Sequence, residues 1–150
     1  MKAVIMAGGD GKRLRPLSCT MPKPMVPLLN KPVLGYCMEL IKKHGFDEAI
    51  LTLRYLPNVI RRYVGDGSAF GIKVECAVED KPMGTAGGVK NALKQADDSV
   101  LIMSGDAMCD FDLTDAMREH RRSGAAATIL LKKVKVPMEY GVVLKDKTAS

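Results

Sequence analysis

Three short stretches of the sequence gather residue types that could hold a phosphorylated ligand. The first loop, residues 8–31, follows an apolar run, and its glycines leave the backbone bare, so that N–H groups can approach an anion closely. These glycines are Gly8, Gly9 and Gly11. Three nearby cations add positive charge: Lys12, Arg13 and Lys23. The composition of the first loop therefore indicates an anion-binding segment.

The glycine spacing in the first loop differs from the common phosphate-binding motifs. Met6 stands where a Walker loop requires its first glycine, and Leu14 stands where a Rossmann fingerprint requires its last. A plain glycine turn with solvated charges is the alternative for this loop taken alone. Prolines favour a binding loop, because they stiffen a connection that is long for a compact domain. They are Pro16, Pro22, Pro24, Pro27 and Pro32.

The second loop, residues 79–88, brings glycines to the start of a predicted helix. Residues 79–89 read EDKPMGTAGGV, and the predicted helix has its apolar positions at Val89, Ala92 and Leu93. A helix N-terminus with bare backbone suits the polar edge of a ligand. The alternative is an ordinary capped helix with Thr85 near its start.

The third loop, residues 104–110, places Asp106 directly after an apolar run. A carboxylate there suits Mg²⁺, which prefers one or two carboxylates together with phosphate oxygens, although a turn residue is the alternative. We interpret Asp110 as a loop charge and Asp112 as the N-cap of the next helix. Together the three loops predict a site for nucleotide phosphate and Mg²⁺.

Strand-like and helix-like patterns alternate between these loops. Continuous or alternating apolar residues predict strands over Ala3–Ala7, Ala49–Leu53, Ile72–Val78 and Val100–Met103. Helical spacing predicts helices over Leu34–Ile41, Val59–Val64 and Leu113–His120. Gly45 and Gly124 follow basic last turns and should end two of the helices, and a further strand is expected after Gly124. The order predicts an α/β fold with a mostly parallel sheet, whose ligand binds beyond the carboxyl ends of the strands.

The composition is that of one globular domain and limits the possible partners. Of the 150 residues, 47% are hydrophobic and 27% are charged, and the net charge is +6. The charge suggests a nucleic-acid partner, but aromatic residues make up only 5% of the chain and leave few platforms for stacking bases. A steep salt dependence of oligonucleotide binding would support that alternative.

The cysteines and apolar runs indicate a cytoplasmic protein. The four cysteines are far apart and form no C-x-x-C pair, which disfavours a zinc site or a redox pair and fits a reducing compartment. No run approaches the roughly 18 apolar residues of a membrane span. We therefore expect no membrane partner, and the sequence leaves open whether the chain forms a homo-oligomer.

The three loops resemble the sugar-1-phosphate nucleotidylyltransferases. Their signature of a glycine turn, Arg-Leu-x-Pro-Leu and Pro-Lys-Pro is similar to AGGDGKRLRPLSCTMPKP, and GTAGGV and SGD follow in the expected order. The segment over residues 55–89 is most similar to mannose-1-phosphate guanylyltransferase-like members. The resemblance covers essentially the whole chain. It implies a three-layer, Rossmann-like nucleotidyltransferase fold over residues 1–150, Mg²⁺ as cofactor, and a nucleoside triphosphate and a sugar 1-phosphate as substrates.

The resemblance also implies a role for each matched residue. In the family's reaction a sugar-1-phosphate oxygen attacks the α-phosphorus of the nucleotide and releases pyrophosphate. The nucleotide would contact Gly8, Gly9, Gly11, Lys12, Arg13, Glu79, Gly84 and Thr85. The catalytic residues would be Arg13 at the departing pyrophosphate, Lys23 at the reacting phosphates and Asp106 at Mg²⁺. The sugar would lie beside Tyr140 and Gly141.

The expected substrates are GTP and mannose 1-phosphate. A carboxylate only accepts hydrogen bonds and guanine offers two adjacent donors, so Glu79 favours GTP if it meets the Watson–Crick edge. Thymidylyl, uridylyl or adenylyl transfer to glucose 1-phosphate is the alternative. Lys12 stands where the family usually has threonine. Family members also continue well beyond this length, so we expect the nucleotide half of the site and incomplete activity, and a non-catalytic nucleotide-binding regulatory module is a further alternative.

Overall fold

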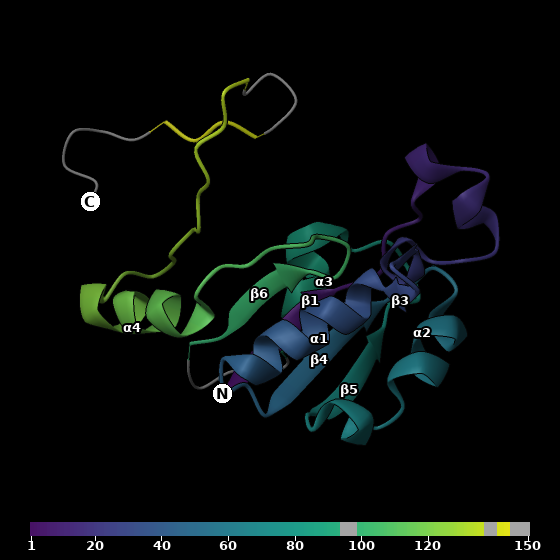
Figure 1. Ribbon diagram of the computed structural model, residues 1–150, viewed down its shortest axis with the longest axis horizontal. Coiled ribbons are helices and arrows are strands. Elements are labelled where there is room, and N and C mark those ends of the chain that lie inside the picture. The colour runs from purple at the N-terminus through teal and green to yellow at the C-terminus, as the bar shows by residue number, and fades with distance from the viewer. Residues whose placement is uncertain (94–98, 137–140, 145–150) are drawn as a thin grey trace.

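A four-stranded parallel sheet forms the centre of the protein (Figure 1). The computed structural model describes residues 1–93, 99–136 and 141–144. The strands, in their order across the sheet, are β5 (Lys73–Val78), β4 (Glu48–Leu53), β1 (Lys2–Met6) and β6 (Leu101–Ser104). Val4 of β1 lies opposite Ile50 of β4 and Ile102 of β6. The four predicted strands are confirmed, with ends that differ by at most one residue.

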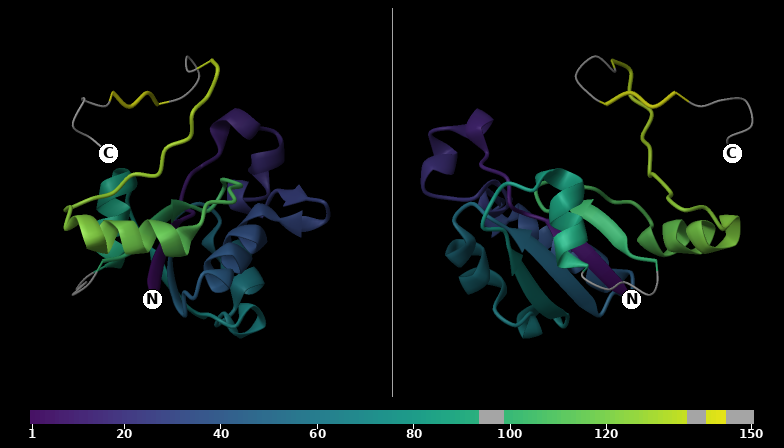
Figure 2. Two further views of the ribbon diagram at one scale, coloured as in Figure 1. Left: turned by 60° about the vertical axis from the view of Figure 1, so that its left-hand side comes forward. Right: turned by 180° about the vertical axis from the view of Figure 1, so that it is seen from behind.

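Helices cover both faces of the sheet and give three layers. One face carries α1 (Val33–Lys43), α2 (Pro57–Val64) and α4 (Leu113–Ser123), which share one buried cluster with the strands. The other face carries α3 (Gly84–Ala92), which contacts β1 and β4. Figure 1 shows α1 in front of the sheet, and the view from behind in Figure 2 brings α3 forward. The predicted three-layer α/β fold with a parallel sheet is confirmed.

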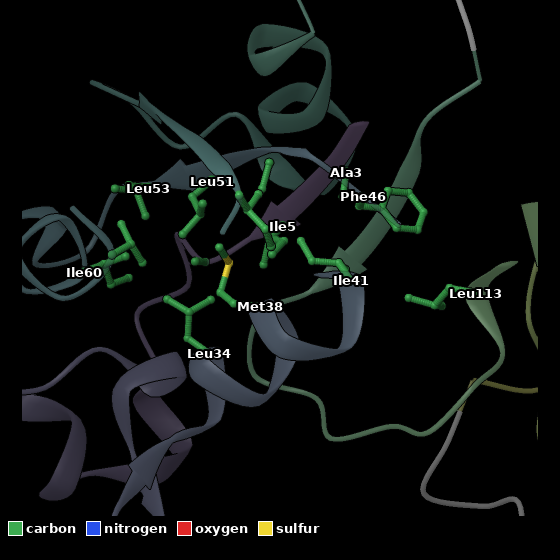
Figure 3. Close-up of a cluster of buried hydrophobic side chains, with 14 of the residues drawn as sticks. Ala3, Ile5, Leu34, Met38, Ile41, Phe46, Leu51, Leu53, Ile60 and Leu113 are labelled. Carbon is green, nitrogen blue, oxygen red and sulfur yellow. The ribbon is translucent and has the colours of Figure 1, made fainter. Parts of the chain in front are cut away.

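Alternation along the central strands sends side chains to the two layers. Ala3 and Ile5 of β1 point toward α1, whereas Val4 between them points to the opposite face, and all three are fully buried. Figure 3 shows Ile5 packed among side chains of α1 and β4. Each fully buried aliphatic side chain of this kind contributes about 1.5–3 kcal/mol relative to an exposed one. This core fixes the strand ends from which the three loops emerge.

The helix ends agree with the sequence signals. The Asp112 carboxylate accepts a hydrogen bond from the Asp115 amide at 2.9 Å, so Asp112 is the N-cap of α4, as predicted. Gly124 follows α4 with a φ of 62°, and Gly45 follows α1 with a φ of 76°. Both angles lie in the left-handed region that glycine adopts without strain. Among the helices of the described residues, none has the length and apolar character needed to cross a membrane.

The first loop contains short ordered elements in place of a free connection. Three 3₁₀ helices, η1 (Lys12–Leu14), η2 (Leu17–Cys19) and η3 (Lys23–Met25), follow each other and lead to a small antiparallel hairpin of β2 (Pro27–Leu28) and β3 (Lys31–Pro32). The beginning of this loop, drawn in purple in Figure 1, projects beyond the carboxyl ends of the strands. The loop therefore adds ordered structure on the side of the sheet where ligands of such folds bind.

The strand expected after Gly124 is absent from residues 125–136, which have no regular secondary structure. This segment leaves α4 and runs away from the sheet (Figures 1 and 2). Its apolar side chains are exposed, with Ile129 at 71% and Val136 at 65%. The prediction of a strand here is wrong, because a β-type sequence forms a strand only when a neighbouring strand accepts its backbone hydrogen bonds.

Candidate active site

The three loops leave the sheet at the same edge, and a backbone hydrogen bond ties the start of each to a neighbouring strand. Those hydrogen bonds are Ala7 N–H to the Thr52 carbonyl at 3.0 Å, Glu79 N–H to the Leu53 carbonyl at 2.8 Å, and Gly105 N–H to the Met6 carbonyl at 2.9 Å. Each bond continues the ladder of a parallel pair by one step. The strands of the central sheet therefore fix where the three loops begin.

A cleft of about 340 Å³ lies between the three loops. Seven of the predicted site residues line it: Gly8, Gly9, Lys23, Glu79, Gly84, Thr85 and Asp106. The remaining lining residues are Met6, Ala7, Pro24, Thr52, Arg54, Pro82 and Ser104. The volume is within the range of small-molecule sites. The structure thus joins residues from all three loops, up to 98 positions apart in the chain, in one concave site.

Asp106 lies at the end of β6 and faces a lysine of the first loop. Lys23 Nζ lies 2.5 Å from Asp106 Oδ2, and the Ser104 hydroxyl donates a hydrogen bond to Asp106 Oδ1. Burial alone would raise the pKa of Asp106, but the hydrogen bonds from Lys23 and Ser104 and the lysine charge together hold it below its ordinary value of 3.8. Asp106 is therefore an ionised carboxylate at neutral pH.

The surroundings of Asp106 suit a cation. The Lys23 ammonium already occupies one side of the carboxylate, which shows that a positive charge fits there. Within the described part of the chain, no three His, Cys, Asp or Glu side chains gather as a ready metal cage. A hard cation such as Mg²⁺ would need its other ligands from phosphate oxygens and water, which is how Mg²⁺ usually binds at nucleotide sites. The residues present fit a metal that arrives with its nucleotide.

Gly105 allows the third loop to turn closely over β1. A Cβ atom at this position would lie 3.0 Å from Ile5 Cγ2 and 3.2 Å from the Met6 carbonyl oxygen. Both neighbours belong to the central strand and cannot move without disturbing the core. A glycine before Asp106 is thus required to place the carboxylate at the edge of the cleft.

The buried thiol of Cys37 supports the third loop from below. Cys37 Sγ lies 3.5 Å from the Ala107 carbonyl oxygen and 3.8 Å from that of Ser104, so the thiol can donate to the backbone on either side of Asp106. Burial, with smaller contributions from nearby Cys109 and Asp106, raises the pKa of Cys37 to about 11. Cys37 is therefore a protonated thiol that links α1 to the loop carrying Asp106.

Glu79 lies at the other side of the cleft, against the start of α3. The Met83 amide donates to Glu79 Oε2 at 3.4 Å, and a Cβ atom at Gly88 would lie only 2.3 Å from Glu79 Oε1. Gly88 therefore leaves the space that the carboxylate occupies. The N-cap position of α3 is Met83 and carries no side-chain cap hydrogen bond, so the alternative in which Thr85 caps the helix is not supported.

The family model of the nucleotidyl transferases matches residues 2–150 of this sequence. The chain belongs to the nucleotidyl transferase family. It is 40% identical to a UTP–glucose-1-phosphate uridylyltransferase of Synechocystis sp., covering 97% of this chain and 41% of that protein. It is 38% identical to a mannose-1-phosphate guanylyltransferase of Mycobacterium tuberculosis, again covering 97% of this chain and 41% of the relative. The chain thus spans about two fifths of the length of these relatives.

A solved structure supports the same family fold. The crystal structure of HddC from Yersinia pseudotuberculosis complexed with GMP-PN matches with a TM-score of 0.71 and 35% identity, covering 79% of this chain and 53% of that one. The predicted Rossmann-like architecture of a nucleotidyl transferase is therefore confirmed.

Some residues assigned by resemblance lie outside the cleft. Gly11, Lys12 and Arg13 are at or within η1, and among the described residues they do not line the cleft; Lys12 and Arg13 are exposed. Gly141 is exposed and is not among the residues that line the cleft, whereas Tyr140 lies outside the described residues. Their roles toward triphosphate and sugar stay predictions.

The sequence analysis missed Arg54, a cation that lines the cleft. Arg54 follows the last residue of β4, and its guanidinium forms an ion pair with the Asp10 carboxylate. A signal was present, because Arg54 comes directly after a buried strand in the same way as Asp106. A single arginine at this position forms no multi-residue motif, so the sequence pattern alone does not distinguish it from other arginines.

Proposed function

We propose that the protein transfers a nucleotidyl group from GTP to mannose 1-phosphate, giving GDP-mannose and pyrophosphate. One observation carries the proposal: the cleft holds a cation and a carboxylate, Lys23 and Asp106, on one side and a second carboxylate, Glu79, on the other. The first pair suits phosphate with a metal, and the second carboxylate suits the donor edge of a base. The family membership supports nucleotidyl transfer as the reaction.

The proposed reaction needs positioning and charge neutralisation more than covalent chemistry. An oxygen of the sugar phosphate attacks the α-phosphorus and forms a new P–O bond, while the bond from this phosphorus to the β-phosphate oxygen breaks and pyrophosphate leaves. Lys23 would neutralise the reacting phosphates, and Arg13 would steady the pyrophosphate. Gly8 and Gly9 would present backbone N–H groups to the nucleotide.

Asp106 would hold the Mg²⁺ that we propose as cofactor. When bound, the metal neutralises phosphate oxygens in the transition state. The contribution of the chain is to keep Asp106 ionised and fixed, through Ser104, and to keep Lys23 within reach of the same phosphates. The hydrogen-bonded carboxylate needs no further deprotonation at neutral pH before it can bind a cation.

The choice of GTP depends on Glu79. The names of the relatives do not agree on the base, since one is a uridylyltransferase and another a guanylyltransferase. The Glu79 carboxylate accepts hydrogen bonds only, and guanine presents its ring N–H and amino group side by side. Uracil and thymine pair a donor with acceptors, so a carboxylate leaves their acceptors without a partner. Transfer of another nucleotide to glucose 1-phosphate remains the alternative.

The compartment that we propose is the cytoplasm. All four cysteines are free thiols, including the exposed Cys19. Free thiols persist in a reducing compartment, where disulfides are rare. The same compartment holds nucleoside triphosphates.

Calorimetric titration of the 150-residue chain with GTP, UTP, dTTP, ATP and CTP tests the proposal. Binding is the readout, because the chain spans about two fifths of its relatives' length. We expect selective, Mg²⁺-dependent binding of GTP, and a shift toward UTP or dTTP in Glu79→Gln. Glu75→Gln, at an exposed position of β5, is the matched control and should leave selectivity unchanged. Unchanged selectivity in Glu79→Gln would show that Glu79 does not read the base and would remove it from the argument for GTP. A folded chain that binds none of the five nucleotides would overturn the proposal for this chain.

Lys12 supports a second candidate, a nucleotide-binding regulatory module without turnover. The lysine adds a charge to η1 where the family usually has a hydroxyl. Binding of nucleotide by a protein that forms no nucleotide sugar would favour this candidate. Formation of GDP-mannose from GTP and mannose 1-phosphate would exclude it.

A further inference from the structure

Two residues that follow β4 contact the glycine-rich part of the first loop, residues 8–19. The Arg54 guanidinium forms an ion pair with Asp10 near the start of this segment. The Tyr55 hydroxyl lies 2.8 Å from the Ser18 carbonyl oxygen and 3.2 Å from that of Cys19 near its end. Neighbouring residues of one strand end therefore hold both ends of the segment.

Ser18 links Tyr55 to the glycine turn, because its carbonyl contacts Tyr55 and its hydroxyl contacts Gly11. Its side chain is only 1% exposed, and Ser18 Oγ donates to the Gly11 carbonyl at 2.8 Å. The Leu14 amide donates to the same carbonyl at 2.8 Å. Gly11 itself has a φ of 60°, and a Cβ atom there would lie 3.1 Å from Ser18 Cβ. The conformation at Gly11 thus depends on where Ser18 is held.

The anchor extends directly from the buried centre of the sheet. β4 lies between β1 and β5, and the residue before Arg54, Leu53, is fully buried. At the start of the segment, a Cβ atom at Gly8 would lie 3.4 Å from the Arg54 backbone nitrogen, so the two backbones are already close. Residues 8–19 contribute no strand to the sheet and depend on such contacts for order. A segment ordered in advance binds a ligand more tightly, because less conformational entropy is lost on binding.

We propose that Arg54 and Tyr55 are positioning residues, which hold residues 8–19 in the conformation that receives the nucleotide phosphates. The inference rests on the proposed nucleotide function and adds to it two residues to which the resemblance assigns no role. Arg54 also lines the cleft, so direct contact with a phosphate is the competing explanation. Tyr55 decides between the two, because its neutral hydroxyl is already bound to loop carbonyls and serves the positioning role alone.

Hydrogen–deuterium exchange of the protein by itself is the first test. In Tyr55→Phe and Arg54→Gln we expect the amides of residues 9–19 to exchange about fivefold to tenfold faster, the effect of losing one hydrogen bond or ion pair. Tyr36→Phe and Arg118→Gln are matched controls, since Tyr36 bonds to Leu28 and Arg118 to Asp115, and neither contacts residues 8–19 in the described part of the chain. Unchanged exchange in both test variants would overturn the proposal.

Calorimetry with Mg²⁺–GTP is the second test. Asp10→Asn and Arg54→Gln should each weaken binding about fivefold, and the double variant should be no weaker than either single variant, because both remove the same contact. Additive losses, or tighter binding by Asp10→Asn, would overturn the proposal in favour of direct contact between Arg54 and phosphate. If the unaltered chain binds no nucleotide, the proposed function fails, and the exchange experiment still decides whether the two residues order the segment.

Discussion

Lys23 and Asp106, 83 positions apart, form an ion pair of 2.5 Å between Nζ and Oδ2 within the cleft. The lysine comes from η3 in the first loop, and the aspartate from the turn after β6. A nucleotide that places a phosphate on Lys23 and a metal on Asp106 must separate these two charges and give each a new partner. Without a nucleotide, the ion pair compensates both charges and keeps both side chains in the cleft.

Replacing Asp106 by alanine should remove the metal-dependent part of nucleotide binding. The carboxylate is the protein ligand that we propose for Mg²⁺, and loss of such a ligand should weaken Mg²⁺–GTP binding by roughly 100-fold. Titrations with and without Mg²⁺ measure the effect. Asp110→Ala, four residues further along and outside the lining of the cleft, is the control among the described residues and should bind as the unaltered chain does. Equal binding by Asp106→Ala would assign the metal to other ligands.

Replacing Gly88 by alanine should change base selectivity while the fold survives. The new methyl group would lie 2.3 Å from Glu79 Oε1, which is too close for two non-bonded atoms, and the flexible glutamate would turn away. We expect GTP to lose its advantage over UTP in the nucleotide panel, with little change in the melting temperature.

Gly9→Ala serves as a control for added bulk in the cleft, because nothing lies within 4 Å of its Cβ position. That substitution should leave the preference among bases unaltered. A Gly88→Ala variant that still selects GTP would show that Glu79 does not read the base from its observed position.

The order of the strands and loops could be predicted from the sequence because each depends on local patterns. The run Ala49–Leu53 is apolar throughout, as a strand buried on both faces must be, and it forms β4. The three loops could be placed at one edge because parallel strands share a carboxyl end. Asp106 was found by this rule. Arg54 was not, although the same rule applies to it.

Contacts between distant residues could not be predicted. Nothing in the local sequence shows that Glu79 lies over Gly88, or that Cys37 lies beneath the loop of Asp106. Segment 125–136 shows the opposite limit. Its β-type composition predicts a strand, but pairing is a property of the partner as well as of the segment. The sequence pattern describes the segment only and says nothing of the partner strand.

Cys37 should resist alkylation in the folded chain. Thiolate is the reactive form, and with its pKa raised to about 11 by burial, only on the order of one Cys37 in a thousand is ionised near pH 8. Exposed Cys19 should react with iodoacetamide within minutes, and peptide mass spectrometry distinguishes the two sites. In denaturant all four cysteines should react alike. Rapid labelling of Cys37 in the native protein would show that the third loop opens away from α1.

The N-cap of α4 should give stability a dependence on acid pH. The Asp115 amide, followed by the charges of His44 and Arg118, holds the pKa of Asp112 below its ordinary 3.8. A lowered pKa means that the stabilisation by the charge is complete above the unfolded value and is lost as the pH falls through the folded value. Asparagine caps equally well without charge. Asp112→Asn should therefore melt at a lower temperature than the unaltered chain at pH 7.

Melting curves from pH 7 downward provide the measurement. The difference between Asp112→Asn and the unaltered chain should shrink toward zero as the carboxyl group becomes protonated. Asp110→Asn changes a carboxylate that caps no described helix, and it should show no such convergence. A difference that stays constant over the whole range would mean that the charge of Asp112 does not stabilise α4.

The exposed apolar side chains of residues 125–136 have a consequence for the behaviour of the chain in concentrated solution. Residues 125–130 line one cavity together with β6. Within the described residues, β6 pairs with β1 alone and leaves its other edge open, with Ile102 47% exposed. The open strand edge of one molecule can pair with an apolar β-type segment of another. The net charge of +6 opposes such contacts through repulsion that salt screens. Samples should therefore stay dispersed in dilute buffer and scatter more light as salt and protein concentration rise.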